Sequence, residues 1–369
     1  MRSRIIIFIA VIQSILFLGH WFLYRTLIYF WQDSDSPRNW SLQLALGLLS
    51  VSFIAASLLA FRFYNIFVRI FYTVAAVWLG FLNYFFLAAC LCWIVYGVFR
   101  VAGLHTGRGT IATPLFVVAF VVSGYGVLNA WNTRVKRISV QLPNLPEAWR
   151  GRTAALVSDT HLGHVRNFRF LRRIVSKLSQ LKPDIVFLTG DLYDGTAADV
   201  HRLAHPLSQL SAPLGAFFIT GNHEEFRDHT SYVKAVAQAG VRVLNNEKVI
   251  VDGLQIVGVH HRDSVNPENF RSILQRAAIA RDRASVLLVH TPDRTQITEQ
   301  EGISLQLCGH THRGQLFPFS WITARIYGPL VYGLARIGNL LNYTTSGAGT
   351  WGPPLRMGTN PEIVLIQFE

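Results

Sequence analysis

Four long apolar runs dominate the first 130 residues of the chain. They cover roughly residues 5–23, 42–61, 71–99 and 111–130. Each run approaches or exceeds the ~20 residues with which a helix crosses a bilayer. Aromatic residues lie near the proposed ends, as they do at membrane interfaces: Trp21, Trp31, Trp40 and Tyr72. The pattern predicts a transmembrane region of about four helices in residues 1–131.

From Thr153 onward, short apolar runs alternate with amphipathic stretches. The short runs read as buried strands at residues 153–158, 184–188, 214–219, 285–289 and 304–307. Strands that alternate with helical patterns indicate an α/β sheet. We expect this second domain to span residues 153–369. Residues 132–152, which are basic and then contain Pro143 and Pro146, are typical of a linker in loop or extended structure.

Composition and charge support a membrane protein. The chain is 51% hydrophobic and 15% charged, whereas soluble domains carry about 25% charged residues. Residues 1–150 have a net charge of +9 and residues 151–369 one of +4. Since the basic excess belongs to the apolar half and no Lys/Arg stripe is interleaved with aromatics, it indicates membrane topology and not nucleic-acid binding. The three cysteines have no zinc-type spacing and form no disulfide framework.

Basic residues predict the orientation of the four spans. Seven fall on one side (Arg2, Arg4, Arg62, Arg69, Arg134, Lys136 and Arg137) and three on the other (Arg38, Arg100 and Arg108, with Asp33 and Asp35). The positive-inside rule then predicts a multi-pass protein, of the inner membrane if bacterial, with a cytoplasmic second domain. An odd span count would reverse this placement. The spans contain few polar groups (Gln13, His20, Asn83 and Asn129), which favours anchoring over transport.

Polar side chains suited to a metal follow each of the five predicted strands. They are Asp159, His161, Asp191, Asn222, His290, His310 and His312. Because sites in α/β sheets form beyond the carboxyl ends of strands, these side chains are expected to converge. The set comprises two carboxylates, one amide oxygen and four imidazoles. These are more ligands than one tetrahedral zinc ion takes, and their number suits two metal ions with open coordination positions. The imidazoles favour Mn, Fe, Zn or Co over Mg or Ca.

The remaining histidines follow no predicted strand end. They are His164, His201, His205, His229 and the pair His260 and His261. We interpret them as surface residues or as neighbours of the metal ligands.

The strand-end motifs resemble the signature of the calcineurin-like metallophosphoesterases. They are Asp159-x-His161, Gly190-Asp191-x-x-Asp194, Gly221-Asn222-His223-Glu224, His290 and Gly309-His310-x-His312. The resemblance covers about residues 150–369 and implies a β-sandwich flanked by helices with a di-metal centre at one edge. The C-terminal stretches 347–356 and 361–363 resemble the YkuE/YaeI-like branch, several members of which carry amino-terminal membrane helices. Protein Ser/Thr phosphatases have Arg-Gly where this chain has Gly195 and Thr196, which argues against a phosphoprotein phosphatase.

The resemblance also implies a role for each residue of these motifs. Asp159, His161 and His312 would hold the first metal, and Asn222, His290 and His310 the second, with Asp191 bridging them. His223 would be catalytic, acting on the phosphate or the leaving oxygen, and Asp194 and Glu224 would orient the groups around it. Two divalent ions (Mn, Zn or Fe) would clamp an in-line displacement in which a bridging hydroxide attacks phosphorus.

These inferences predict a membrane-anchored phosphoesterase that cleaves phosphodiester or pyrophosphate bonds. A membrane anchor favours a lipid-linked substrate, and some bacterial relatives suggest UDP-2,3-diacylglucosamine of lipid A synthesis. The aromatic stretch 316–341 suits a flap that touches lipid, or else a core helix and hairpin. Two alternatives stay open: a tethered phosphodiesterase or phosphatase for soluble substrates, and a non-catalytic membrane sensor. The sequence predicts no particular protein partner.

Overall fold

The computed structural model describes residues 2–31 and 40–369, with side chains from Ile6 onward. Three residues of the charge comparison (Asp33, Asp35 and Arg38) lie outside the described residues, as do the side chains of Arg2 and Arg4. The chain divides into two compact units. One comprises residues 1–128 and 352–355, and the other comprises residues 129–351 and 356–369.

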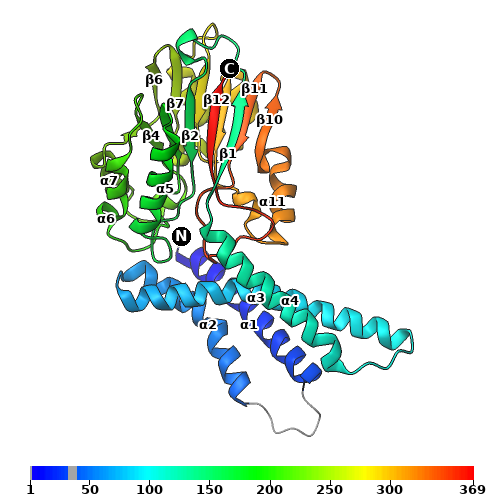
Figure 1. Cartoon of the computed structure of the whole chain (residues 1–369). Helices are drawn as coiled ribbons and strands as arrows, with labels where there is room; N and C mark the ends of the chain where they lie inside the picture. The colour runs from blue at the N-terminus through cyan, green and yellow to red at the C-terminus, as the bar shows by residue number, and fades with distance from the viewer. Residues whose placement is uncertain (1, 32–39) are drawn as a thin grey trace. The chain divides into compact units, whose positions relative to one another are not determined.

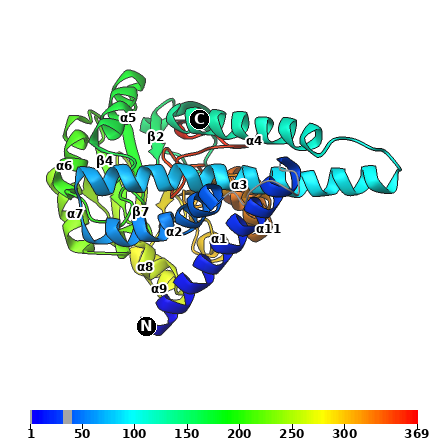
Figure 2. The ribbon, with the colours of Figure 1, turned by 90° about the horizontal axis from the view of Figure 1, so that it is seen from below.

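The first unit is built from four helices that are long and apolar enough to cross a membrane. They are α1 (Arg2–Trp31), α2 (Trp40–Arg62), α3 (Ile66–Val101) and α4 (Arg108–Trp131). The predicted number of candidate membrane helices is therefore confirmed, although each helix extends beyond its apolar run. Helix α1 contacts α2 and α3 and runs obliquely to α3 in Figure 2. Leu23, Leu46, Leu82 and Ala89 form a core among these helices.

Polar side chains of the apolar helices bond to neighbouring helices. The Gln13 amide donates to the Ser50 carbonyl across 3.0 Å, and Trp78 Nε1 donates to His20 Nε2 across 2.9 Å. His20 Nδ1 donates in turn to the Leu16 carbonyl at 2.7 Å, so both ring nitrogens are used. Such bonds between membrane helices stabilise packing modestly.

The second unit contains two six-stranded sheets (Figure 1). The first sheet has the order β1-β12-β2-β3-β4-β5 and the second the order β10-β11-β9-β8-β7-β6. The strands of the first are β1 (Arg134–Val140), β2 (Thr153–Val157), β3 (Ile185–Thr189), β4 (Ala216–Ile219), β5 (Arg242–Val243) and β12 (Glu362–Phe368). Those of the second are β6 (Glu247–Val251), β7 (Leu254–Gly258), β8 (Ser285–Leu288), β9 (Leu305–Cys308), β10 (Gly333–Ile337) and β11 (Leu340–Thr344).

The sheets pack face to face, and helices cover their outer faces. Along β2, Ala154 and Leu156 enter the core between the sheets, whereas Ala155 and Val157 enter the core under the helices. Both faces of these strands are thus apolar, which explains their continuous hydrophobic runs. The covering helices are α5 (Phe168–Leu181), α6 (Val200–Ala204) and α7 (His229–Gln238) on the first sheet, and α8 (His261–Ser264), α9 (Pro267–Ala277) and α10 (Thr295–Gln300) beside the second.

Helix α5 shows how local sequence sets these elements. Asn167 caps it by accepting from the Arg169 amide, and Lys182 ends it in the left-handed region. Between them, Phe170, Ile174 and Leu178 recur at helical spacing and are buried against the sheet. The expected α/β sandwich with flanking helices, preceded by four candidate membrane helices, is confirmed.

The strands that matter for function run parallel in each sheet. β2, β3 and β4 are mutually parallel, as are β7, β8 and β9. Their carboxyl ends therefore point in the same direction within each sheet. The segments that follow these strands thus lie along one edge of the sandwich.

Candidate metal centre

The seven predicted ligands lie directly after the carboxyl ends of β2, β3, β4, β8 and β9. Five of them occupy the left-handed backbone region that non-glycine residues rarely adopt: Asp159 (φ 53°), His161 (48°), Asp191 (50°), His310 (71°) and His312 (48°). Each such conformation costs about 1–3 kcal/mol, and such residues cluster at functional sites. These sharp turns aim side chains from distant strands at one another.

The structure brings Asp159, His161 and His312 into a first group. His161 Nε2 and His312 Nε2 lie 3.0 Å apart, and His312 Nε2 lies 3.5 Å from an Asp159 carboxylate oxygen. One donor atom from each residue lies within 4.8 Å of the others. All three side chains are buried.

A second group contains Asn222, His290 and His310. The Asn222 amide oxygen lies 3.1 Å from His290 Nε2 and 3.0 Å from His310 Nδ1. His290 Nδ1 donates to the Thr189 carbonyl at 2.8 Å, so Nε2 is the ring nitrogen that faces the group. A backbone bond of this kind is how proteins orient a metal-binding imidazole.

Asp191 lies between the two groups. Its Oδ2 is 3.2 Å from His290 Nε2 and 3.9 Å from His161 Nε2. Burial disfavours the charged form, but the neighbouring His290 and His223 hold the pKa of Asp191 well below its ordinary value. Its carboxylate therefore faces donor atoms of both groups.

The donor set fits divalent metal ions. Asp159 and Asp191 are 0% and 2% exposed, and burial raises the pKa of Asp159. A buried carboxylate is costly without a counter-charge, and imidazole nitrogens and carboxylate oxygens are the donors that Zn, Mn and Fe take. The two groups and Asp191 would hold such ions.

Two glycines permit the close approach of the loops. A Cβ on Gly221 would lie 2.2 Å from Asp191 Oδ1, and a Cβ on Gly309 would lie 2.2 Å from Asp159 Oδ2. Both distances are far shorter than van der Waals contact. Larger residues at these positions would displace the carboxylates.

The predicted catalytic residue, His223, lies at the same edge. Its Nδ1 donates to the Asp194 carbonyl at 3.0 Å, and its Nε2 lies 3.9 Å from Asp191 Oδ2. Its ring packs beside Phe226 and Trp351, with centroids 4.5 and 5.8 Å away. Burial lowers the pKa of His223, against the opposing effect of Asp191. Nε2 is thus the ring atom directed at the site.

Glu224 and Asp194 support the loops around the site. Glu224 is fully buried and accepts hydrogen bonds from the backbone amides of Asp191, Tyr193 and Gly221, so it ties the loop after β3 to the loop after β4. Burial raises its pKa to about 7. An Asp194 carboxylate oxygen lies 3.5 Å from His161 Nδ1.

Two further residues contact the site, of which Arg356 was not predicted to do so and His261 was predicted only as either a surface residue or a neighbour of the metal ligands. Arg356 is fully buried, donates to the His312 carbonyl at 2.9 Å, and places Nη2 3.0 Å from His312 Nδ1. The ring centroid of His261 lies 5.7 Å from that of His290. The only sequence signal for Arg356 is its place in the 347–356 stretch, and no strand end precedes His261 that could have decided between its two interpretations.

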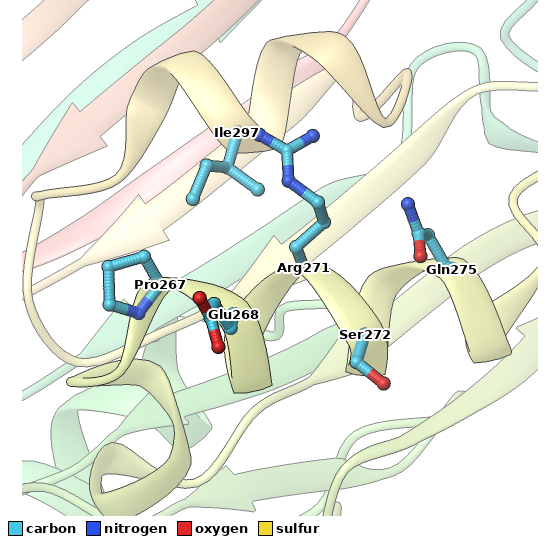
Figure 3. A pocket seen from close by; sticks show the side chains of 6 residues that line it. All are labelled: Pro267, Glu268, Arg271, Ser272, Gln275 and Ile297. Carbon is cyan, nitrogen blue, oxygen red and sulfur yellow. The ribbon is translucent and has the colours of Figure 1, made fainter.

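A separate pocket of about 220 Å³ lies between α9 and α10 (Figure 3). Its lining is Pro267, Glu268, Arg271, Ser272, Gln275 and Ile297. The Arg271 guanidinium already donates to Glu301 and Gln300, at 3.2 and 2.9 Å. This lining lacks the imidazoles and paired carboxylates that converge at the strand ends.

Comparison with known proteins agrees with this geometry. The family model described as calcineurin-like phosphoesterase matches residues 153–314. A transmembrane protein with metallophosphoesterase domain from Danio rerio is 30% identical over 68% of this chain, and the chain spans 61% of that relative. An uncharacterized metallophosphoesterase, YkuE, from Bacillus subtilis is 30% identical over 61% of this chain and 82% of its own length. The resemblance is confirmed, and the chain belongs to the calcineurin-like metallophosphoesterase family.

Proposed function

We propose that this protein is a membrane-anchored phosphoesterase that cleaves phosphodiester or pyrophosphate bonds of a lipid-linked substrate with two divalent metal ions. The observation that carries the proposal is the position of Asp191 between a buried group of donors and a second group that is buried at His290 and half-buried at Asn222 and His310. Asp159, His161 and His312 would hold one ion, and Asn222, His290 and His310 the other. Bound there, the ions would supply Lewis acidity and an activated water.

His223 would act on the oxygen that leaves phosphorus. The Asp194 carbonyl fixes the ring by accepting from Nδ1, so Nε2 is the atom that would meet the substrate. In its protonated form this nitrogen can stabilise or protonate the leaving oxygen. Phe226 and Trp351 pack on the ring and limit the water around it.

Helix α11 (Phe319–Tyr327) supports a lipid-linked substrate. None of its residues is buried, and Trp321, Ile322 and Ile326 are 70%, 54% and 69% exposed. This exposure favours the predicted lipid-contacting flap over a core helix. At the end of α11, the Tyr327 ring lies 6.2 Å from that of His310, so the apolar face begins beside the proposed site.

UDP-2,3-diacylglucosamine combines the two features that this arrangement would recognise. It has a pyrophosphate bond for the metal centre and acyl chains for the apolar face of α11. The excess of basic residues on one side of the four spans supports a cytoplasmic catalytic domain.

The test measures hydrolysis by the full chain purified in detergent. The protein is stripped of metal, reloaded with Mn²⁺ or Zn²⁺, and given an aryl phosphodiester or UDP-2,3-diacylglucosamine. We expect metal-dependent release of UMP. Cleavage of the aryl ester alone would reject this lipid substrate, and bound metal without any turnover would reject the enzyme in favour of a binding role.

A variant pair tests the role of α11. Trp321→Ser should raise KM for the lipid substrate while leaving the aryl ester unaffected. Ile250→Ser on β6 is the control, since Ile250 is likewise a large apolar side chain exposed to solvent, at 57%. An equal effect of both variants on both substrates would remove α11 from the proposal.

A further inference from the structure

A second set of metal-binding side chains lies outside the proposed dinuclear centre. It consists of Glu225, His229 and His260. Glu225 follows β4, His229 is the first residue of α7, and His260 lies just beyond β7. One donor atom from each lies within 4.8 Å of the other two. Three separate segments of the chain therefore meet at this cluster.

The three facing atoms have no hydrogen-bond partner. Glu225 Oε1 and His229 Nδ1 lie 3.1 Å apart without hydrogen-bond geometry, and His260 Nε2 is likewise buried and unbonded. An unsatisfied buried polar atom costs about 1–3 kcal/mol, and such atoms are rare in folded proteins. An ion pair between Glu225 and His229 would account for two of the atoms and leave His260 Nε2 unexplained.

Surrounding groups hold two of the three side chains, those of Glu225 and His260, with these atoms facing inward. His260 Nδ1 lies 2.6 Å from Thr220 Oγ1, which leaves Nε2 for the cluster. Arg262 contacts Glu225 Oε2 and leaves Oε1. Asn246 accepts from the His260 amide at 3.0 Å and fixes the backbone there. Hydrogen-bond partners of this kind orient the side chains that ligate the ion in metal sites.

We propose that Glu225, His229 and His260 bind a further divalent transition-metal ion of the zinc class. Two imidazoles and one carboxylate are a known ligand set for zinc, in which a fourth position stays open to water. Bond lengths of ~2.0–2.1 Å place tetrahedral ligands about 3.3 Å apart. The 3.1 Å between Glu225 Oε1 and His229 Nδ1 is close to that spacing.

This ion would position the loop that carries Asn222 and His223. Glu225 follows these residues by two or three positions, whereas His229 and His260 belong to α7 and to the segment after β7. Binding would tie the C-terminal part of the loop, from Glu225 to the start of α7, to the segment that follows β7 of the second sheet. The site does not depend on the proposed function, because none of its ligands belongs to the dinuclear groups.

The experiment counts zinc ions per chain. Full-length protein in detergent is stripped, reloaded with Zn²⁺ and measured by mass spectrometry. His229→Ala and His260→Ala should each bind one ion fewer than the unaltered chain, whereas His201→Ala, an exposed histidine of α6, should bind the same number. Equal counts in all four proteins would overturn the proposal. The difference is informative whatever the dinuclear centre holds, and Asp191→Ala should keep this ion.

A second measurement needs no variant. Anomalous scattering at the zinc edge, from crystals of the unaltered chain grown with saturating Zn²⁺, should show a peak among Glu225, His229 and His260. A map with peaks elsewhere and none here would refute the site, even if both histidine variants fail to fold.

Discussion

The two units treat buried polar groups in opposite ways. In the helical unit, Trp78 bonds to His20 and Trp93 bonds to Thr26, so these polar atoms are satisfied by neighbouring helices. In the sandwich unit, buried carboxylates and imidazoles converge at the strand ends, and several of their atoms lack partners. Since a buried polar atom needs a partner, the second arrangement indicates a ligand that the protein itself does not supply.

The helical unit and the sandwich unit also differ in backbone conformation. Within the described residues of the helical unit, no residue other than glycine has a positive φ, whereas five of the seven proposed ligands do. Strain of this kind persists only where the surrounding fold enforces it. The sandwich therefore concentrates strain, burial and charge at one edge, while the helices show the features of an anchor.

Asp191→Ala should have the largest effect on the sandwich site. Removing the carboxylate that faces both groups should lower metal content and reduce kcat by about 10³-fold or more, because metal catalysis contributes several kcal/mol and each 1.4 kcal/mol is tenfold. Metal analysis and aryl-ester turnover check this. Asp282→Ala, at an exposed position, is the control. Full activity with Asp191 removed would end the dinuclear assignment.

His223→Ala should separate chemistry from metal binding. We expect kcat to fall about 10²–10⁴-fold, the usual contribution of a general acid, while metal content stays the same. The comparison protein is His205→Ala, whose histidine is exposed. Loss of metal together with activity would make His223 a structural residue instead.

Arg356→Lys should weaken metal binding at the first group. The guanidinium holds His312 at its carbonyl and near Nδ1, and it also donates to Ser346 and Gly349, a geometry that lysine cannot reproduce. Loss of such a supporting group costs about 10–100-fold in metal affinity. Metal titration of this variant beside Arg336→Lys, an exposed control, measures the effect. Unchanged affinity would show that packing alone positions His312.

The convergence of the proposed ligands was predictable because its signal is local. Asp159, Asp191 and His290 each follow a short apolar run, and parallel strands bring such ends together. The position of Arg356 was not predictable, since its contact with His312 depends on how the C-terminal loop packs. β1 lies inside the stretch expected to be a linker, and it pairs with β12 at the far end of the chain. The periodicity of the short basic segment 134–140 carries no information about its pairing with β12, which lies more than 200 residues later in the chain.

Trp78→Phe should have the smallest effect of these variants. It tests whether the helical unit contributes to stability but not to catalysis. It removes the donor to His20 Nε2 between α1 and α3, and hydrogen bonds between membrane helices contribute about 0.6 kcal/mol on average. The thermal unfolding midpoint in detergent should fall slightly, with kcat and metal content unchanged. Trp21→Phe, at a side chain that is 53% exposed, is the matched control. A loss of turnover as large as that of His223→Ala would mean that the helices take part in catalysis, and the contrast between anchor and site would no longer hold.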